Sequence, residues 1–247
     1  MIDLTSKTIL VTGASSGIGQ ATAILCDSLG ASVIISGRNE EKLIGTLSQM
    51  SDRTQLVIAD LTDDIGISKL VDSISKIDGL FHGVGMIQPY PIKFIKRKNI
   101  EELLNTNLTS AILVTSNLLK NKKVSNSSSF VFISSVSASH PYMGGALYST
   151  SKAALEAFTR SVALEHANQK IRANILAPAL VQTEMFNKTK EAYSEDEFQQ
   201  IINQYPLGIG QPIDVARAAV FLLSEASNWI TGTTLQMDGG LLLNSKR

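Results

Sequence analysis

This sequence of 247 residues has a single cysteine, no excess of charge of either sign and no long apolar run. Cys26 is the only cysteine, so an internal disulfide and a thiolate metal site are excluded, and no metal is expected. We interpret Cys26 as a small buried residue on a helix, with a reactive thiol as the alternative. Lys and Arg number 22, as do Asp and Glu, which leaves no basic surface of the kind that binds nucleic acid.

No apolar run approaches the ~20 residues that span a bilayer. The first seven residues also lack the basic start and apolar stretch of a signal peptide. We therefore expect a cytoplasmic protein that does not enter a membrane. The 44% of hydrophobic residues is ample for a packed core, which excludes a disordered chain.

Short β-rich runs alternate with helical periodicities along almost the whole chain, which predicts a single α/β domain over residues 1–247. The predicted strands are 8–11, 32–35, 55–59, 79–82, 129–134, 171–176 and 233–237. Apolar residues at three-and-four spacing predict helices at 18–29, 40–50, 65–75, 99–119, 149–167 and 213–224. Right-handed crossovers then give a doubly wound, Rossmann-type parallel sheet of about seven strands with helices on both faces.

One segment, 184–206, breaks this alternation. It is rich in charge and carries Phe186, Tyr193, Phe198, Ile201, Ile202 and Tyr205. Spaced aromatic residues in a long connection favour a mobile helical lid.

The first predicted strand leads directly into a glycine-rich turn. Its sequence is Thr12-Gly13-Ala14-Ser15-Ser16-Gly17-Ile18-Gly19, and a helical pattern starts at Gly17. Gly13 would permit the tight turn, Gly17 the approach of a pyrophosphate to the backbone, and Gly19 the close packing of helix and sheet, with the phosphates at the helix N-terminus. The turn predicts a dinucleotide site, and a plain glycine-rich turn is the alternative.

The residues after the second and third strands bear on cofactor choice. A carboxylate that would bind the ribose of NAD is missing from Ser36-Gly37-Arg38-Asn39. Arg38 offers a fork suited to a phosphate, so we expect NADP(H) in preference to NAD(H), unless Arg38 merely caps a helix start. Asp60 and Leu61 are predicted to contact the adenine, with a helix cap as the alternative for Asp60.

Tyr148 and Lys152 are four residues apart, so on a helix both project from one face. A charge about 4 Å from the phenol is worth up to about 4 kcal/mol, or about three pKa units. The pair predicts a tyrosine whose pKa falls toward neutrality, where a general acid or base is most effective.

Together, the glycine-rich turn and the ordered set Asn107, Ser135, Tyr148 and Lys152 resemble the short-chain dehydrogenase/reductase family over nearly the whole chain. The resemblance implies that Tyr148 gives a proton to a substrate carbonyl and that Ser135 hydrogen-bonds the same oxygen. It implies that Lys152 lowers the tyrosine pKa and holds the nicotinamide ribose, and that Asn107 orders a water. Ser135 could instead cap the end of a strand, in which case Ser134 is the candidate catalytic serine. Asn107 could instead satisfy backbone groups at a helix kink. The further cofactor contacts implied are Gly85, Pro178, Val181 and Thr183.

Two positions depart from the family pattern. His82-Gly83-Val84-Gly85 replaces the usual Asn-Asn-Ala-Gly, and we interpret His82 as a structural histidine in preference to an acid or base. Ala179 follows Pro178 where glycine is usual, and its methyl group could narrow the nicotinamide side or force a different φ.

Within the family, the length and the tail at 229–232 and 238–240 resemble 3-oxoacyl-thioester reductases. The residues expected around the substrate are Met86, Ile87, Ser135, His140, Tyr142, Met143, Tyr148 and the lid aromatics. A basic rim for an acidic acyl-carrier protein could come from Lys120, Lys122 and Lys123, or these could form a solvated helix end. The resemblance implies a homotetramer built from the helices 99–119 and 149–167 and the last strand. The apolar run 241–243 is unfavourable in water, so we predict that a partner subunit covers it.

Three functions remain open at this point. The first is an NADP(H)-dependent reductase or dehydrogenase acting on an acyl thioester, a sugar or polyol, or a cell-envelope glycan precursor. The second is a catalytically silent regulatory protein that binds the cofactor. The third is a transferase that shares only the fold.

Overall fold

The computed structural model describes residues 2–190 and 194–244. Its centre is a seven-stranded sheet in which every neighbouring pair is parallel, in the order β3-β2-β1-β4-β5-β6-β7. The strands are β1 (Thr8–Thr12), β2 (Ser32–Gly37), β3 (Gln55–Ile58), β4 (Ile77–His82), β5 (Val124–Ile133), β6 (Arg172–Pro178) and β7 (Thr234–Met237). The predicted doubly wound sheet is therefore confirmed, with strand ends displaced by a few residues.

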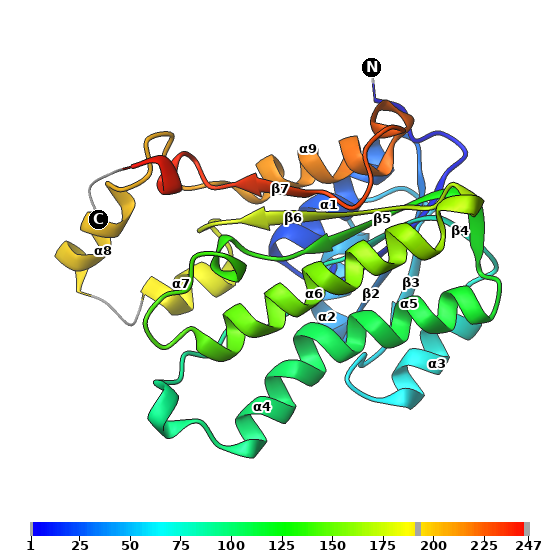
Figure 1. The fold of residues 1–247 in the computed structure, drawn as a ribbon. Coiled ribbons are helices and arrows are strands. Elements are labelled where there is room, and N and C mark those ends of the chain that lie inside the picture. The colour runs from blue at the N-terminus through cyan, green and yellow to red at the C-terminus, as the bar shows by residue number, and fades with distance from the viewer. Residues whose placement is uncertain (1, 191–193, 245–247) are drawn as a thin grey trace.

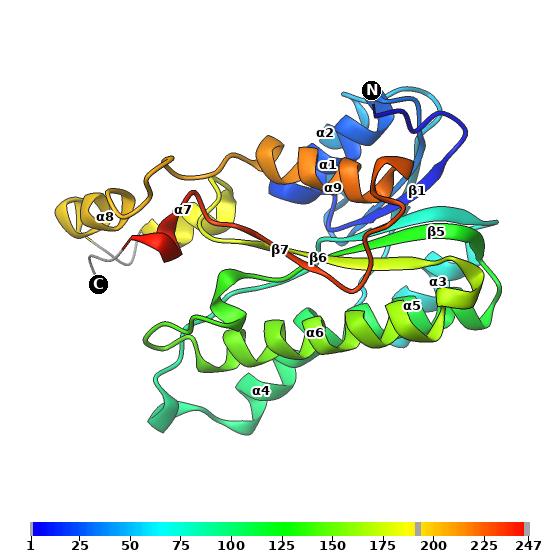
Figure 2. The same cartoon turned by 45° about the horizontal axis from the view of Figure 1, so that its top comes forward.

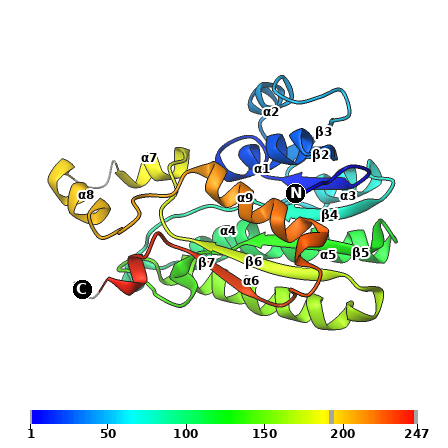
Figure 3. The same cartoon turned by 90° about the horizontal axis from the view of Figure 1, so that it is seen from above.

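Helices cover both faces of the sheet (Figure 1). Figure 2 places α1 (Gly17–Ser28), α2 (Glu40–Leu47) and α9 (Pro212–Leu223) above it, and α3 (Asp64–Asp72), α4 (Arg97–Leu104), α5 (Ser110–Lys120) and α6 (Ala146–Glu165) below. Figure 3 looks down on the face carrying α1 and α9. Consecutive residues of a strand pack against the helices on opposite faces of the sheet, because side chains alternate across a strand. Leu80 and Phe130 belong to one apolar cluster, whereas Phe81 and Val131 belong to the other. Cys26 is fully buried in this second cluster, as predicted.

The helix predicted at 99–119 is interrupted. A π-helical turn, Asn105–Thr109, separates α4 from α5. Side-chain hydroxyls bond the backbone here: Thr106 Oγ1 donates to the carbonyl of Glu102 at 3.1 Å, and Ser110 Oγ to that of Thr106 at 2.7 Å. Such turns are rare and frequently lie at functional sites. This one carries Asn107.

The segment predicted as a lid contains two helices, α7 (Glu184–Lys190) and α8 (Glu195–Ile202), beyond the carboxyl edge of the sheet (Figures 1 and 3). Phe186 and Phe198 join them in an edge-to-face ring pair with centroids 5.2 Å apart. The predicted helical character is confirmed, whereas the mobility stays a prediction. Tyr193 lies outside the described residues. Within the described ranges, no helix has the length and hydrophobicity of a transmembrane span.

Candidate active site

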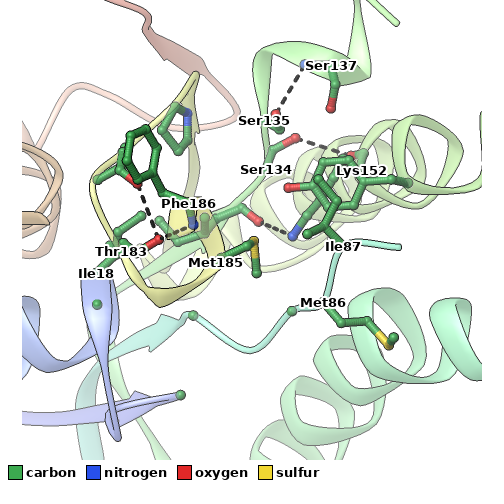
Figure 4. A pocket seen from close by; sticks show the side chains of 18 of the residues that line it. Ile18, Met86, Ile87, Ser134, Ser135, Ser137, Lys152, Thr183, Met185 and Phe186 are labelled. Atoms are coloured by element: carbon green, nitrogen blue, oxygen red, sulfur yellow. Dashed lines mark hydrogen bonds between the residues drawn. The ribbon is translucent and has the colours of Figure 1, made fainter. Parts of the chain in front are cut away.

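A cavity of about 1390 Å³ opens at the carboxyl ends of the strands, where a doubly wound sheet places its ligands. Its lining includes Gly13, Ser15, Ser16, Gly17, Ile18, Gly19, Arg38, Asp60, Leu61, Gly85, Met86, Ile87, Ser135, His140, Tyr142, Tyr148, Lys152, Pro178, Val181 and Thr183. Figure 4 shows Ser135 and Lys152 on one side and Ile18, Thr183 and Phe186 on the other. Among the described residues, the sequence-predicted catalytic and cofactor residues and Met86, Ile87, His140 and Tyr142 therefore meet in one place, with two exceptions. Met143 is 97% exposed and lies outside the lining, and Asn107 is buried behind it.

The glycine-rich turn has the geometry that a phosphate site requires. Gly13 has a φ of +70°, and a Cβ there would lie 2.8 Å from the carbonyl carbon of Gly83. A Cβ at Gly19 would lie 2.1 Å from the oxygen of Gly13. The first turn of α1 holds no acidic residue, and its N-cap residue Ser16 makes no side-chain cap. The amides of that turn are left for an anion, so the turn fits a pyrophosphate.

Arg38 follows β2 and lines the cavity. Its side chain is 67% exposed, with Nη1 3.8 Å from Asp60 Oδ2. Asn39 caps α2 and Asp63 caps α3, so neither Arg38 nor Asp60 is the N-cap of these helices. Asp60 does accept from the backbone N–H of Thr62 at 3.0 Å, so a local structural role for Asp60 stays open. Partial burial acts to raise the pKa of Asp60, but hydrogen bonds from Thr62 and the charge of Arg38 outweigh it and hold that pKa below its usual value. An exposed guanidinium beside an ionised carboxylate, with no acid at the tip of β2, fits a ribose phosphate.

Tyr148 and Lys152 share one face of α6, as predicted. Lys152 Nζ donates to the carbonyl of Ile133 at 2.8 Å and lies 5.7 Å from the centroid of the Tyr148 ring. Burial lowers the pKa of Lys152 to about 8. Burial also raises the pKa of Tyr148 to about 12, only partly offset by its hydrogen bond with Ser135. The predicted fall toward neutrality is therefore wrong for this state of the protein, because burial disfavours the phenolate more strongly than hydrogen bonding favours it.

The two candidate serines are separated by their contacts. Ser135 begins a 3-10 turn and accepts from the backbone N of Ser137 at 3.2 Å, with its side chain toward the cavity. It is both a strand-end cap and the hydrogen-bond partner of Tyr148. Ser134 is 1% exposed, and its hydroxyl lies 2.9 Å from a carboxylate oxygen of Glu156. Ser135 is the serine available to a ligand.

His82 has a partner at each ring nitrogen. Thr12 Oγ1 lies 3.0 Å from Nδ1, and Ser110 Oγ lies 3.4 Å from Nε2. Because Ser110 already donates to Thr106, Nε2 carries the proton and Nδ1 accepts. Burial, followed by the charge of Lys152, lowers the pKa of His82 to about 3, so it is neutral. These contacts are those of the structural histidine predicted from the sequence.

Ala179 keeps an ordinary backbone. Among the described residues, the non-glycine positions with positive φ are Ser6, Lys122, Ser127 and Lys170. Ala179 donates its backbone N–H to Met237 at 3.0 Å and continues the pairing of β6 with β7. The departure from glycine therefore forces no left-handed conformation there.

The cavity also includes residues that the sequence did not single out. Among them are Gln88, Glu102, Asn105, Ser137 and Met185. The run 241–243 was predicted to need a partner subunit, but Leu241 and Leu242 line the cavity of their own chain and only Leu243 is left 87% exposed. An apolar run after the last strand was the only signal for this role.

Comparisons with known proteins agree with this geometry. A family sequence model described as enoyl-(acyl carrier protein) reductase matches residues 13–242. The chain is 35% identical over 244 residues to a 3-oxoacyl-[acyl-carrier-protein] reductase of Rickettsia felis, with 98% of this chain and all of that protein covered. It is 31% identical to the protein of the same name from Thermotoga maritima, over 97% of this chain and 99% of that protein. A short-chain type dehydrogenase/reductase from Mycobacterium ulcerans superposes with a TM-score of 0.88 and 28% identity, covering 98% of this chain and 92% of that one.

A parallel seven-stranded sheet, a glycine-rich turn and a cavity lined by Ser135, Tyr148 and Lys152 define a nicotinamide-dependent oxidoreductase. The chain belongs to the short-chain dehydrogenase/reductase family.

Proposed function

We propose that this enzyme is an NADP(H)-dependent reductase of the 3-oxo group of an acyl thioester. The observation that carries the proposal is that Ser135, Tyr148 and Lys152 line one cavity together with Arg38 and the glycine-rich turn. NADP(H), when bound, supplies the hydride. The amides at the start of α1 hold the pyrophosphate, and Arg38 holds the ribose phosphate.

Tyr148 and Ser135 act together on the substrate oxygen. Both residues line the cavity, so a carbonyl oxygen bound between them receives a hydrogen bond from each hydroxyl group. The high pKa of Tyr148 keeps its proton in place at neutral pH until the carbonyl oxygen becomes basic. The Lys152 ammonium, 5.7 Å from the Tyr148 ring, stabilises the phenolate that remains and binds the nicotinamide ribose.

The remaining walls suit an acyl chain. Met86, Ile87, Phe186, Phe198 and Leu241 all line the cavity. Apolar walls with a few convergent polar groups are typical of small-molecule sites. His140 and Tyr142 lie on the substrate side, and α7 and α8 exclude water when the substrate is bound.

We extend the proposal to a cytoplasmic homotetramer built from one domain. β7 is an edge strand of the sheet. Trp229, which precedes it in the chain, is 99% exposed, and Leu164 on α6 is 80% exposed. Exposed edges and apolar side chains of this kind are features that subunit contacts cover. A monomeric mass by light scattering would contradict the assembly.

The test of the reaction is the initial rate of NADPH oxidation with an acetoacetyl thioester, with NADH in parallel. Tyr148→Phe is the control, and it should still bind NADPH while its turnover falls at least about 100-fold. A 2-enoyl thioester and a panel of sugars, polyols and glycan precursors should be poor substrates. If any of these compounds were turned over faster than the acetoacetyl thioester, that compound class would be the substrate instead. Binding of NADPH without turnover of any compound would favour the catalytically silent regulatory protein.

A further inference from the structure

A basic and apolar surface lies beside the mouth of the cavity, on the segment 89–98, which we name the rim segment. Its cations are Lys93, Lys96, Arg97 and Lys98, so four of the 22 basic residues fall within six positions. Between them, Ile92 is 76% exposed and Phe94 is 60% exposed. A groove of about 460 Å³ runs along the segment, lined by Tyr90, Lys93, Phe94, Ile95, Lys96 and Asn99.

The rim segment is fixed at the entrance to the active site. It starts one residue after Gln88, which lines the cavity, and Tyr90 donates its backbone N–H to Gly144 at 2.8 Å. Gly144 lies in the loop that carries Tyr142, also part of the lining. Figures 1 and 2 both show the start of α4, where the segment ends, on the carboxyl side of the sheet. Anything bound to this surface therefore lies next to the opening.

The positive charge of the segment is mostly uncompensated. Within the described ranges, the only carboxylate within 4 Å of these four cations is that of Glu101, 3.9 Å from Arg97 Nη1. Lys93 Nζ lies 5.0 Å from the centroid of the Phe94 ring. Because the whole chain has a formal net charge of zero, this local excess is a feature of the rim and not of the protein as a whole.

We propose that the rim segment is the docking surface for an acidic carrier protein that delivers the acyl thioester. The inference rests on the proposed function, since a thioester ketone is the substrate that such a carrier presents. Charge complementarity steers an acidic partner to Lys93, Lys96 and Lys98. Ile92 and Phe94 supply the apolar contact that holds it while its thioester arm enters the cavity.

The other lysine cluster is placed differently. Lys120 ends α5, and Lys122 and Lys123 precede β5, so all three lie at the amino ends of the strands. Figures 1 and 2 show the end of α5 at the far side of the molecule from the cavity loops. Lys123 Nζ also donates to the carbonyl of Ile74. This cluster lies at the opposite end of the strands from the cavity of its own chain, so it serves as the comparison cluster.

The experiment compares one acetoacetyl group on two carriers, an acyl carrier protein and pantetheine. In the double variant Lys96→Glu/Lys98→Glu, KM for the carrier-bound substrate should rise at least about 10-fold while kcat/KM for the pantetheine thioester stays within about twofold. Lys120→Glu/Lys122→Glu should leave both unchanged. Phe94→Ser should also raise KM for the carrier-bound substrate alone.

The outcomes separate the two proposals. Equal KM values for the carrier-bound substrate in the wild type and the rim variants would overturn the docking surface, as would equal losses with both substrates. If the wild type turns over neither substrate, the proposed reaction fails, and fluorescence anisotropy of labelled carrier protein then decides the docking alone. Rim-dependent sedimentation with phosphatidylglycerol vesicles, without rim-dependent carrier binding, would assign the surface to a membrane instead.

Discussion

The side-chain amide of Asn107 is hydrogen-bonded in both directions to the backbone of Met86. Oδ1 accepts from the Met86 N–H at 2.7 Å, and Nδ2 donates to the Met86 carbonyl at 2.9 Å. Asn107 has no exposed surface, and a Cβ at the neighbouring Gly85 would lie 3.6 Å from its Oδ1 and 3.3 Å from Lys152 Nζ. In this structure Asn107 therefore fixes the chain that passes beside Lys152, and its place is behind the cavity wall.

Replacing Asn107 with Ala should damage activity through this contact. It removes a partner from the N–H and from the carbonyl of Met86, both partly buried, at a cost of up to about 1–3 kcal/mol for each group. A shift of the cavity wall by about 1 Å lowers kcat about 100-fold. Steady-state kinetics and urea unfolding measure the two effects.

Ser151→Ala is the control for this prediction. Ser151 is the third partner of Asn107, 3.1 Å from Nδ2. Its loss leaves both bonds to Met86 in place, so kcat should change less than about threefold. Similar losses of kcat in the two variants would contradict a role through Met86.

His82 should make the free energy of unfolding decrease as the pH falls below neutrality. Its pKa is about 3 when folded, against about 6.5 in an unfolded chain. Between these values the unfolded state binds more protons, so stability falls as the pH falls. The free energy of unfolding should drop by about 2 kcal/mol from pH 7 to pH 5 through this residue. His82→Asn should lack that component in urea titrations at the two pH values, and an identical pH dependence in the variant would disprove it.

Arg38 should select the cofactor. A charge-assisted bond to phosphate is worth about 1.5–3 kcal/mol, so Arg38→Ala should raise KM for NADPH about 10–100-fold and leave KM for NADH nearly unchanged. Arg217→Ala, which removes an exposed arginine paired with Asp214 on α9, is the matched control. An equal rise of KM for NADPH and KM for NADH in Arg38→Ala would show that Arg38 does not bind the ribose phosphate.

Positions at strand ends could be predicted from the sequence, because parallel strands deliver their carboxyl ends to one edge. Gly13, Arg38, Asp60 and Ser135 followed from that rule and all line the cavity. The extent of β5 did not follow. Its polar start at 124–128 has the composition of a loop, yet Val124 pairs with Ile77 across an irregularity before the regular register resumes at Gly79.

Properties that depend on packing could not be predicted from the sequence. The spacing of Tyr148 and Lys152 indicated their shared face, but the direction of the Tyr148 pKa depends on burial. The π-helical turn barely alters the apolar period, so the pattern at 99–119 appeared continuous. Its position depends on the hydroxyl bonds of Thr106 and Ser110 and on His82 across the layer.

Lys152 should lower the free energy of unfolding of the protein. Its pKa is about 8 when folded, against about 10.5 in a free side chain, so near pH 7 the fold carries a buried ammonium that costs up to about 3 kcal/mol. Lys152→Met removes this cost and also the bond to Ile133. The variant should therefore be inactive but more stable by roughly 1–3 kcal/mol near pH 7 in urea unfolding without cofactor.

The pH dependence makes the test of Lys152 specific. Between about pH 8 and pH 10.5 the unfolded chain holds the extra proton, so the wild type gains stability from this residue as the pH rises. The advantage of Lys152→Met should shrink to about 1 kcal/mol near pH 9.5. A gain that stays constant between the two pH values would come from better packing of methionine, and a loss of stability near pH 7 would mean that the bond to Ile133 outweighs the desolvation of the charge.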